Sequence, residues 1–231
     1  MIRLVEVTKR FGTKEALTQV YFSLQRGEVL GLIGHNGAGK TTTLRLMAGI
    51  LAPSQGEIYR PANFKAEIGY LRDEPFLFDY LTGREMLCFI AALYQLPRQA
   101  VQPRVQYFLQ LFDLEKQADH LIKTYSRGMR RKTALIGALL HDPIYWLLDE
   151  PTESLDPVAI RVLKDLIRSG RAENRAILVS THQLAFAESL CDRVVILNRG
   201  AVAYAGPLHE LRTPSGEGSS LEDIYLQMVA E

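Results

Sequence analysis

The sequence has few of the features that mark secreted, metal-binding or membrane-spanning chains. Its 231 residues include only two cysteines, Cys88 and Cys191, far apart and outside any C-x-x-C pair. This usage favours buried thiols in a reducing compartment over a disulfide framework. The five histidines show no metal-ligand spacing with each other. No apolar run approaches the ~20 residues that a membrane helix needs, so we expect any membrane role to come through a partner.

Net charge is also nearly absent. The 27 Lys and Arg residues almost balance the 26 Asp and Glu residues, which leaves +1. No overall field therefore attracts the chain to nucleic acid or lipid, and we expect no nucleic-acid partner. The N-terminal MIRLVEVTKRFG alternates like a strand and lacks the apolar segment of a signal peptide.

Buried strands alternate with helices along most of the chain. VLGLIG, PIYWLLDE and AILVS are nearly continuous apolar runs, typical of strands buried on both faces. In SLDPVAIRVLKDLIRSG, Asp156 is the expected N-cap and Pro157 the first helical residue. We expect Val158, Val162 and Leu166 to line one side of that helix. The alternation predicts an α/β fold with a mostly parallel sheet.

Other segments interrupt this alternation. From Pro75 to about Tyr125 the pattern is helical, with Thr82 and Glu85 spaced as a capping box, and we expect a helical insert there. RVVIL and AVAYAG flank the turn residues NRG and predict a hairpin. TPSGEGSS predicts a flexible hinge before a last helix in LEDIYLQMVA.

The segment GHNGAGKTT carries the most specific motif. It fits G-x-x-x-x-G-K-[ST] between a buried strand and a helix, the context of a P-loop. Glycines let backbone N–H groups curl around phosphate oxygens, Lys40 adds a charge, and Thr41 offers a hydroxyl to Mg²⁺. Alone, the motif fits a kinase, a GTPase, a DNA-repair ATPase or a motor equally well.

Acidic residues end the strand in WLLDEPT. Ligands of open α/β sheets bind beyond the carboxyl ends of the strands. There Asp149 can hold Mg²⁺ through water, and Glu150 can orient or deprotonate an attacking water. His182, in STHQ at the end of the next buried strand, either reaches a terminal phosphate or is structural.

A further anion-binding end is expected in TYSRGMRRK. A serine and a glycine that open a helix leave N–H groups pointing outward, where anions bind. We interpret Arg131 and Lys132 as a solvated basic face of this helix, and Arg127 less readily so.

In this order, GHNGAGKTT, YSRGM, LLDEPTESLD and STH resemble the ATP-binding subunit of ABC transporters over almost the whole chain. The resemblance implies a P-loop NTPase core with a mostly parallel sheet, a peripheral antiparallel β subdomain and an inserted α-helical subdomain. We expect one ABC ATPase domain over 1–231, with the helical subdomain at 76–142 and a C-terminal tail with a closing helix at 207–231.

The resemblance also implies the role of each site residue. Glu150 and His182 match the catalytic glutamate and the switch histidine. The Mg²⁺ position is matched by Thr41, Asp149 and Asp73. The ATP-binding positions of the same subunit are matched by Phe11, Gly34, Asn36, Gly37, Ala38, Gly39, Lys40, Thr41 and Thr42. Ser126, Gly128 and Asp156 match segments that meet the ATP of a second subunit.

Phe11 falls where the family stacks a ring on adenine, with a core phenylalanine as the alternative. Phe76, Phe78 and Tyr80 lie where the family docks its permease, and ordinary core aromatics are again the alternative.

The function implied is ATP hydrolysis that powers transport. Two subunits, identical or paralogous, would dimerise around two Mg-ATP and drive export through a separate permease. The chain would be cytoplasmic and peripheral on the cytoplasmic face of the membrane. A basic residue such as Arg127 at this signature position resembles a subset of the family whose permeases export drugs, lipids, polysaccharides or ions.

Two departures from the family pattern bear on activity. Arg127 and Met129 replace the usual glycine and glutamine of the signature. Asp73 stands where the family has a glutamine, or Glu74 does if the register shifts by one residue. A carboxylate there can still meet Mg²⁺, but its charge beside the terminal phosphate makes weakened hydrolysis one alternative.

Two other functions stay open on the sequence. One is a non-transport ATPase that acts on DNA or ribosomes, although the chain has neither a long coiled-coil insertion nor a basic footprint. The other is a weakly hydrolysing nucleotide sensor, supported by Asp73, Arg127 and Met129.

Overall fold

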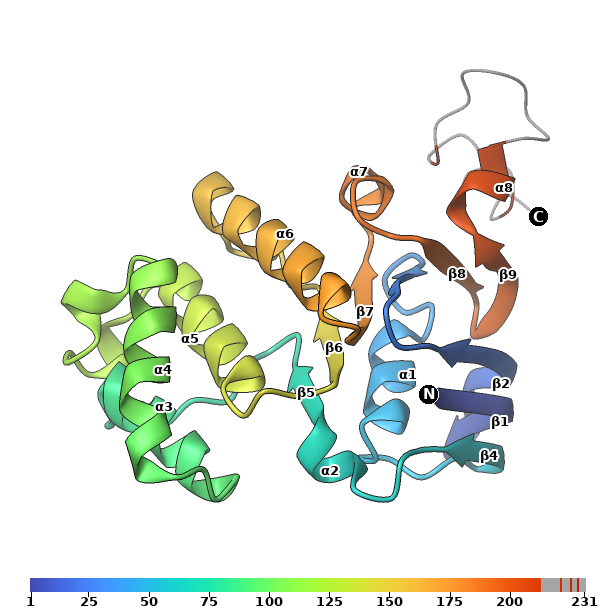
Figure 1. Ribbon diagram of the computed structural model, residues 1–231. Coiled ribbons are helices and arrows are strands. Elements are labelled where there is room, and N and C mark those ends of the chain that lie inside the picture. The colour runs from blue at the N-terminus through green and yellow to red at the C-terminus, as the bar shows by residue number, and fades with distance from the viewer. Residues whose placement is uncertain (213–220, 222–224, 226–227, 229–231) are drawn as a thin grey trace.

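The structure, a computed structural model, describes residues 1–212 together with Leu221, Tyr225 and Met228. A six-stranded sheet lies at its centre (Figure 1). Its strands are β3 (Val29–Ile33), β5 (Ile68–Leu71), β6 (Tyr145–Asp149), β7 (Ala176–Thr181), β8 (Arg193–Asn198) and β9 (Ala201–Pro207). Their order is β5-β6-β7-β3-β8-β9, and only the pair β8–β9 is antiparallel. The carboxyl ends of β3, β5, β6 and β7 therefore meet at one edge.

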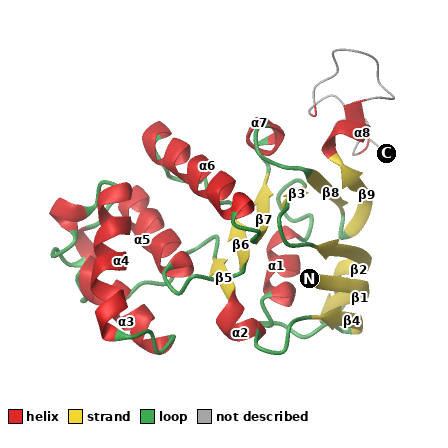
Figure 2. Cartoon of the chain, viewed as in Figure 1, coloured by secondary structure: helices red, strands yellow, loops and turns green. Residues whose placement is uncertain are grey.

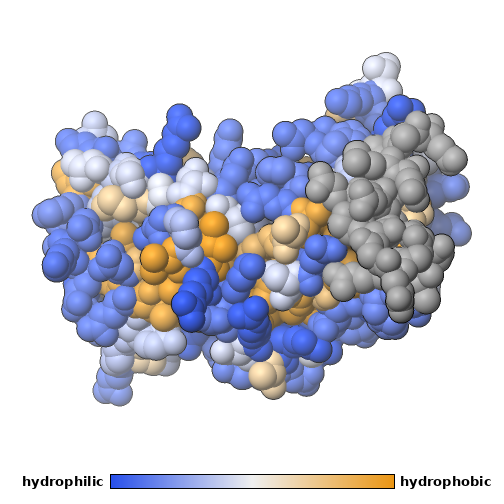
Figure 3. All heavy atoms as spheres, turned by 90° about the horizontal axis from the view of Figure 1, so that it is seen from above, coloured by the Kyte–Doolittle hydropathy of each residue, from blue (hydrophilic) through white to orange (hydrophobic). Residues whose placement is uncertain are grey.

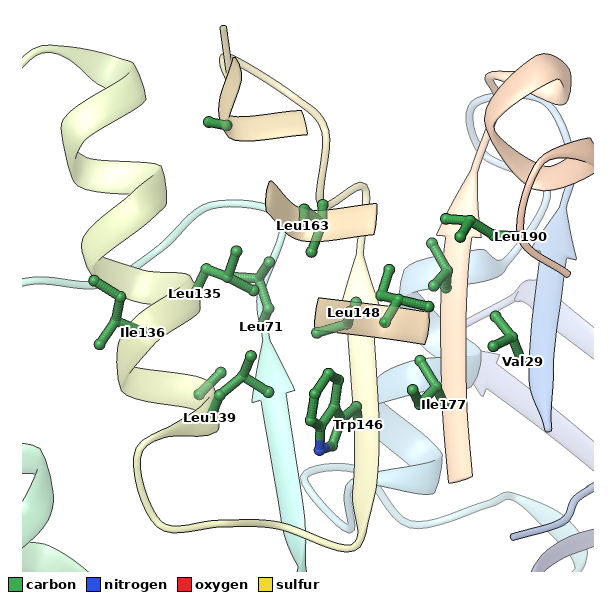
Figure 4. Close-up of a cluster of buried hydrophobic side chains, with 14 of the residues drawn as sticks. Val29, Leu71, Leu135, Ile136, Leu139, Trp146, Leu148, Leu163, Ile177 and Leu190 are labelled. Carbon is green, nitrogen blue, oxygen red and sulfur yellow. The ribbon is translucent and has the colours of Figure 1, made fainter. Parts of the chain in front are cut away.

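Both faces of this sheet are buried, as the continuous apolar runs predict. Side chains alternate between faces along a strand. On β6, Trp146 and Leu148 enter one hydrophobic cluster, whereas Tyr145 and Leu147 enter another on the opposite face. Trp146 is thus a core residue (Figure 4).

A second, antiparallel sheet covers one side of the core (Figure 2). It has the order β2-β1-β4, formed by β1 (Ile2–Phe11), β2 (Lys14–Leu24) and β4 (Gln55–Tyr59). Apolar residues of β1 and β2 share a cluster with α1 (Lys40–Met47) and with one face of the large sheet. The short helix α2 (Phe64–Glu67) leads from β4 into β5. Together the two sheets and their helices confirm the predicted α/β fold class.

The chain between β5 and β6 is helical. Its elements are α3 (Gly83–Leu93), α4 (Arg98–Leu111), the 3₁₀ turns η1 (Glu115–Gln117) and η2 (Ile122–Thr124), and α5 (Arg127–Leu139). The capping box at the start of α3 is confirmed, because Thr82 and Glu85 each bond the other's backbone N–H. Apolar residues of α3, α4 and α5 join the cluster that holds Trp146, so this region shares a core with the sheet. Figure 4 shows the α5 part of this contact, with Leu135 and Leu139 facing the sheet strands. A separate subdomain at 76–142 stays a prediction.

Helix α6 (Pro157–Ala172) corrects one expectation. Asp156 caps it and Pro157 opens it, as predicted. The face that the helix buries, however, holds Ala159, Leu163, Ile167 and Gly170, and Val158 is 74% exposed. A Cβ on Gly170 would lie 2.8 Å from Trp146, so this close contact with the sheet turns the helix about one residue from the predicted face. Val162 and Leu166 pack only at the margin of the cluster.

The last described elements are α7 (Leu184–Glu188), the β8–β9 hairpin and α8 (Leu208–Arg212). The hairpin turn is confirmed, with Arg199 and Gly200 both at positive φ. The hinge predicted at 213–220 and most of the closing helix lie outside the described residues. Leu221 is buried, and Tyr225 and Met228 pack against the main cluster.

One face of the molecule, seen from above Figure 1, is mostly hydrophilic with hydrophobic residues gathered near its middle (Figure 3). Within residues 1–212 and the three further described positions, no helix is both long and apolar enough to cross a membrane.

Candidate nucleotide-binding site

A cavity of about 640 Å³ opens where β3, β6 and β7 end. Its lining joins segments that are far apart in the sequence. They include Phe11, the GHNGAGKTT loop, Asp73, Glu150 and His182. The Phe11 ring is 48% exposed at the rim, with the Lys9 ammonium 5.2 Å from its centroid. A core role for Phe11 is therefore wrong, and its ring is free to stack on a planar ligand.

The loop after β3 has the conformation that a phosphate cradle needs. Gly37 and Gly39 have φ of 84° and 109°, where glycine avoids the strain of a side chain. A Cβ on Gly39 would also lie 2.5 Å from the Leu17 side chain. Asn36, Thr41 and Thr42 line the cavity, whereas Gly34 and Ala38 lie behind it and are not among its lining residues. Ala38 is fully buried.

Lys40 is held in place by the chain itself. It is 6% exposed, and its ammonium donates to the carbonyl oxygens of Gly34 at 2.7 Å and His35 at 3.3 Å. It also lies 3.2 Å from Glu150 Oε1. The positive charge is thus fixed at the floor of the cavity, where a phosphate oxygen would compete with Glu150 for it.

Asp149 ends β6 behind the cavity wall and is fully buried. Its Oδ1 accepts a hydrogen bond from Ser180 at 2.5 Å, while its Oδ2 has no hydrogen-bond partner among the described residues. Burial raises the pKa of this carboxyl, and the hydrogen bond from Ser180 opposes that shift. A buried, unpartnered carboxylate oxygen beside the Thr41 hydroxyl fits a hard cation.

Glu150 follows directly, with its backbone at a φ of 44°. Its N–H donates to the carbonyl and the hydroxyl of Ser180, both at 3.1 Å, which fixes the turn against β7. His182 Nδ1 lies 3.0 Å from Glu150 Oε2. The imidazole is 47% exposed and lines the cavity, so it can contact both Glu150 and a bound ligand.

Asp73 lines the same cavity, and it has a neighbour to which the sequence analysis gave no role. Glu153 also lines the cavity, and its pKa is raised by burial and by the Asp73 carboxyl with which it shares a hydrogen bond. Glu74 lies outside this lining, so Asp73 is the carboxylate that meets the site. Among the described residues, no cluster of three or more His, Cys, Asp or Glu forms a metal site by itself.

Three residues that were expected at the interface with a second subunit lie outside this cavity. Ser126, Gly128 and Asp156 do not line the cavity. Ser126 caps α5 through its hydroxyl, which accepts from Met129 N at 3.2 Å, and its side chain is exposed. Asp156 caps α6 and pairs with Lys132 at 2.8 Å, so both carboxylate oxygens are engaged inside the chain.

The prediction that Arg131 and Lys132 form a solvated basic face on α5 is wrong. Arg131 is 3% exposed, and the Lys132 side chain is 13% exposed in its pair with Asp156. The helix turns these side chains towards the loops after β5 and β6, whose carbonyl and carboxylate oxygens attract them.

Known proteins share this arrangement. The family description "ABC transporter" (ABC_tran) matches residues 17–153. The ABC transporter ATP-binding protein NatA of Bacillus subtilis (strain 168) is 36% identical over 224 residues, 91% of this chain and 91% of NatA. A solved structure of an ATP binding subunit of an ABC transporter superimposes with a TM-score of 0.92, at 33% identity over 99% of each chain.

The chain belongs to the ABC transporter family. A dimeric structure of the ATP-binding cassette MJ0796 in a post-hydrolysis state, bound to ADP and Pi, matches with a TM-score of 0.78. It is 25% identical and covers 90% of this chain and 99% of that one. This ABC protein is accordingly the ATP-binding and ATP-hydrolysing subunit of an ABC transporter.

Residues to which the sequence motifs assigned no role at the nucleotide complete the site of this ABC subunit. Ser180 orients Asp149, Arg199 lines the cavity from the β8–β9 turn, and Arg131 and Glu153 lie at the ends of the acidic loops. Only Glu153 carried a signal in the sequence, its place three residues after Glu150. The others come from segments whose approach depends on the tertiary fold.

Proposed function

We propose that this ABC subunit closes with a second subunit around two Mg-ATP and uses their hydrolysis to drive export through a separate permease. One observation carries the proposal. The cavity collects most of the residues expected to act on the nucleotide, with Asp149 directly behind its wall, but the exposed start of α5 does not line it. An exposed helix start with a capping serine suits the phosphate of another chain.

Within one subunit, the residues divide the work as follows. The glycine-rich loop and Lys40 hold the outer phosphates, and the Phe11 ring supports the base. Thr41, Asp149 and Asp73 would hold Mg²⁺, which neutralises charge on the phosphate oxygens when bound. Glu150 accepts a proton from, or orients, the attacking water. His182 keeps Glu150 in place and contacts the terminal phosphate.

The partner side of the dimer is proposed to supply the second half of the phosphate cage. Ser126 and Gly128 of one copy would meet the ATP that the other copy holds. Donors placed at the terminal phosphate only after closure stabilise the charge that develops there, which couples hydrolysis to the closed state.

A second cavity of about 580 Å³ supports the permease partner. It is lined mainly by apolar side chains, among them Ile50, Tyr70, Phe76, Leu93 and Tyr94. Phe76, Phe78 and Tyr80 are 68%, 43% and 80% exposed, so they are not the core aromatics that the sequence left as an alternative. A groove of this kind suits an amphipathic helix of a membrane protein at the cytoplasmic face.

The dimer proposal is tested with Glu150→Gln. This variant keeps the shape of the residue but removes its basicity, so we expect ATP binding to persist, turnover to fall about 100-fold or more, and a dimer to accumulate with Mg-ATP. Phosphate release and light scattering measure the two effects. Glu173→Gln, the same change at a 61% exposed side chain, serves as the control. Turnover at the wild-type rate in Glu150→Gln would refute the assignment.

The permease groove is tested with Phe76→Asp. A charge in the apolar groove should remove the subunit from the membrane fraction of its own cells while the purified chain still hydrolyses ATP. Tyr107→Asp, at another exposed aromatic (55%), is the matched control. Equal recovery of Phe76→Asp and wild-type protein with membranes would contradict this docking surface.

A further inference from the structure

Arg131 lies in the second turn of α5, and its side chain runs inward below the nucleotide cavity. It is 3% exposed, and burial lowers the pKa of its guanidinium, which nevertheless stays charged at neutral pH. A buried charge is tolerated only where neighbouring groups pair with it. The groups that satisfy Arg131 therefore indicate what it does.

Four backbone carbonyls receive its N–H groups. Nη1 donates to Arg72 O at 2.7 Å and to Asp73 O at 2.5 Å. Nη2 donates to Asp149 O and Glu150 O, each at 2.5 Å. These carbonyls end the neighbouring parallel strands β5 and β6. One planar guanidinium thus ties together the loops that carry Asp73 and Glu150.

The same guanidinium faces the acidic side of the cavity. The carboxylates of Asp73, Glu153, Asp149 and Glu150 are its acidic neighbours. Carboxylates this close repel one another and would repel a terminal phosphate. Arg131 offsets part of this charge from below, without occupying the cavity itself.

Arg131 also belongs to the helix that opens at the exposed Ser126. A contact made at Ser126 reaches Arg131 through little more than one turn of rigid helix. The start of α5 also packs closely against the loop after β6, because a Cβ placed on Gly128 would lie only 2.7 Å from the Ser154 carbonyl oxygen.

We propose that Arg131 is a positioning residue for ATP hydrolysis: it fixes the separation of the Asp73 and Glu150 loops and links both to the signature helix. The inference rests on the proposed function, because only in a closed dimer does the start of α5 meet a phosphate. When that phosphate holds α5, Arg131 holds Glu150 against the attacking water.

The test compares Arg131→Met with Arg130→Met in the full chain, by phosphate release and by binding of a fluorescent ATP analogue. Arg130 is the matched control, since it lies on the same helix but its guanidinium donates to Asp79 at 2.6 Å and to Ile122 O at 3.3 Å and not to the four carbonyls that Arg131 bonds. For Arg131→Met we expect kcat to fall about 10- to 100-fold, because the reacting groups lose their alignment. Nucleotide affinity should stay within about threefold, since the phosphate loop is untouched.

Arg131→Lys keeps the charge but not the planar fork that reaches four carbonyls, so it should recover only part of kcat. Hydrogen exchange gives a readout independent of turnover: amides of 72–74 and 149–153 should exchange faster in Arg131→Met and unchanged in Arg130→Met. A role confined to folding predicts instead a parallel loss of kcat, affinity and helix content.

The outcomes separate the two proposals. Wild-type kcat in Arg131→Met, beside an active wild-type chain, overturns the positioning role alone. A parallel loss of affinity and kcat also overturns it. A wild-type chain that releases no phosphate from Mg-ATP overturns the proposed function, and this inference with it.

Discussion

The nucleotide cavity and the start of α5 are two phosphate-binding regions built in opposite ways. In the cavity, Lys40, Glu150 and His182 contact one another and are held by backbone groups before any nucleotide binds. At the start of α5, Ser126 is exposed and contacts only its own helix. One region is therefore preorganised within the chain, whereas the start of α5 is exposed, as the proposed contact with a second subunit's ATP requires.

Lys40→Ala should produce the largest difference between the two regions. It removes the fixed charge of the cavity, and we expect ATP affinity to fall about 100-fold or more. Ser126→Ala should leave the affinity of the single chain unchanged, because Ser126 does not line the cavity. Isothermal titration with ATP compares them. If Ser126→Ala weakened binding as much as Lys40→Ala, the two regions would form one site.

Gly128→Val should act only on the second region. A Cβ at this position would lie only 2.7 Å from the Ser154 carbonyl oxygen, so the valine would push the start of α5 away from that loop. We expect turnover to fall about 30-fold, with the affinity for ATP nearly unchanged. Steady-state kinetics and single-chain titration separate the two effects, and Ala172→Val, at an exposed position of α6, is a control for a β-branched side chain in a helix. Equal losses in both variants would contradict this reading.

Asp73→Gln tests how the negative charge inside the cavity affects turnover. The carboxyl of Asp73 lies beside that of Glu153, so removing its charge lowers the repulsion that a terminal phosphate meets. The side-chain oxygen of glutamine can still meet Mg²⁺, so we expect turnover to rise about threefold. Phosphate release at saturating Mg-ATP measures the change. A clear fall in turnover would show instead that the carboxylate serves as a Mg²⁺ ligand that glutamine cannot replace.

The smallest effect is expected from Lys132→Met, which breaks the pair with Asp156 behind the start of α5. Lys132 holds the pKa of Asp156 below its usual range. The stability that this ion pair gives the folded state is present above the unfolded-state pKa of aspartate, about 3.9. It is lost as the pH falls through the lower folded-state pKa of Asp156. Lys132→Met should therefore lower the stability at pH 7 by about 0.5 kcal/mol, and the difference should shrink as the pH falls below the unfolded pKa and Asp156 becomes protonated. Urea unfolding at pH 7 and in acid measures it; a loss that persists undiminished in acid would exclude the ion pair as the cause.

Much of the fold was predictable because its signals are local. Continuous apolar runs marked the strands buried on both faces, and Thr82, Asp156 and Pro157 marked helix starts that the structure confirms. The buried face of α6 was not predictable, since two adjacent rows of apolar residues on that helix have the same spacing. Contact between Gly170 and Trp146 selects the row, and that contact depends on tertiary packing.

The sequence by itself determined the membership of the ABC family, the phosphate loop and the acidic end of β6, because these motifs are contiguous and their spacing is set by one strand, one turn and one helix. Only the tertiary structure decided that Asp73 and Glu153 share a wall of the cavity, that Phe76 is exposed, and that Arg131 is buried. A basic residue on a helix has no local signal for burial. Whether it is buried depends on the carbonyls and carboxylates that other segments bring close to it.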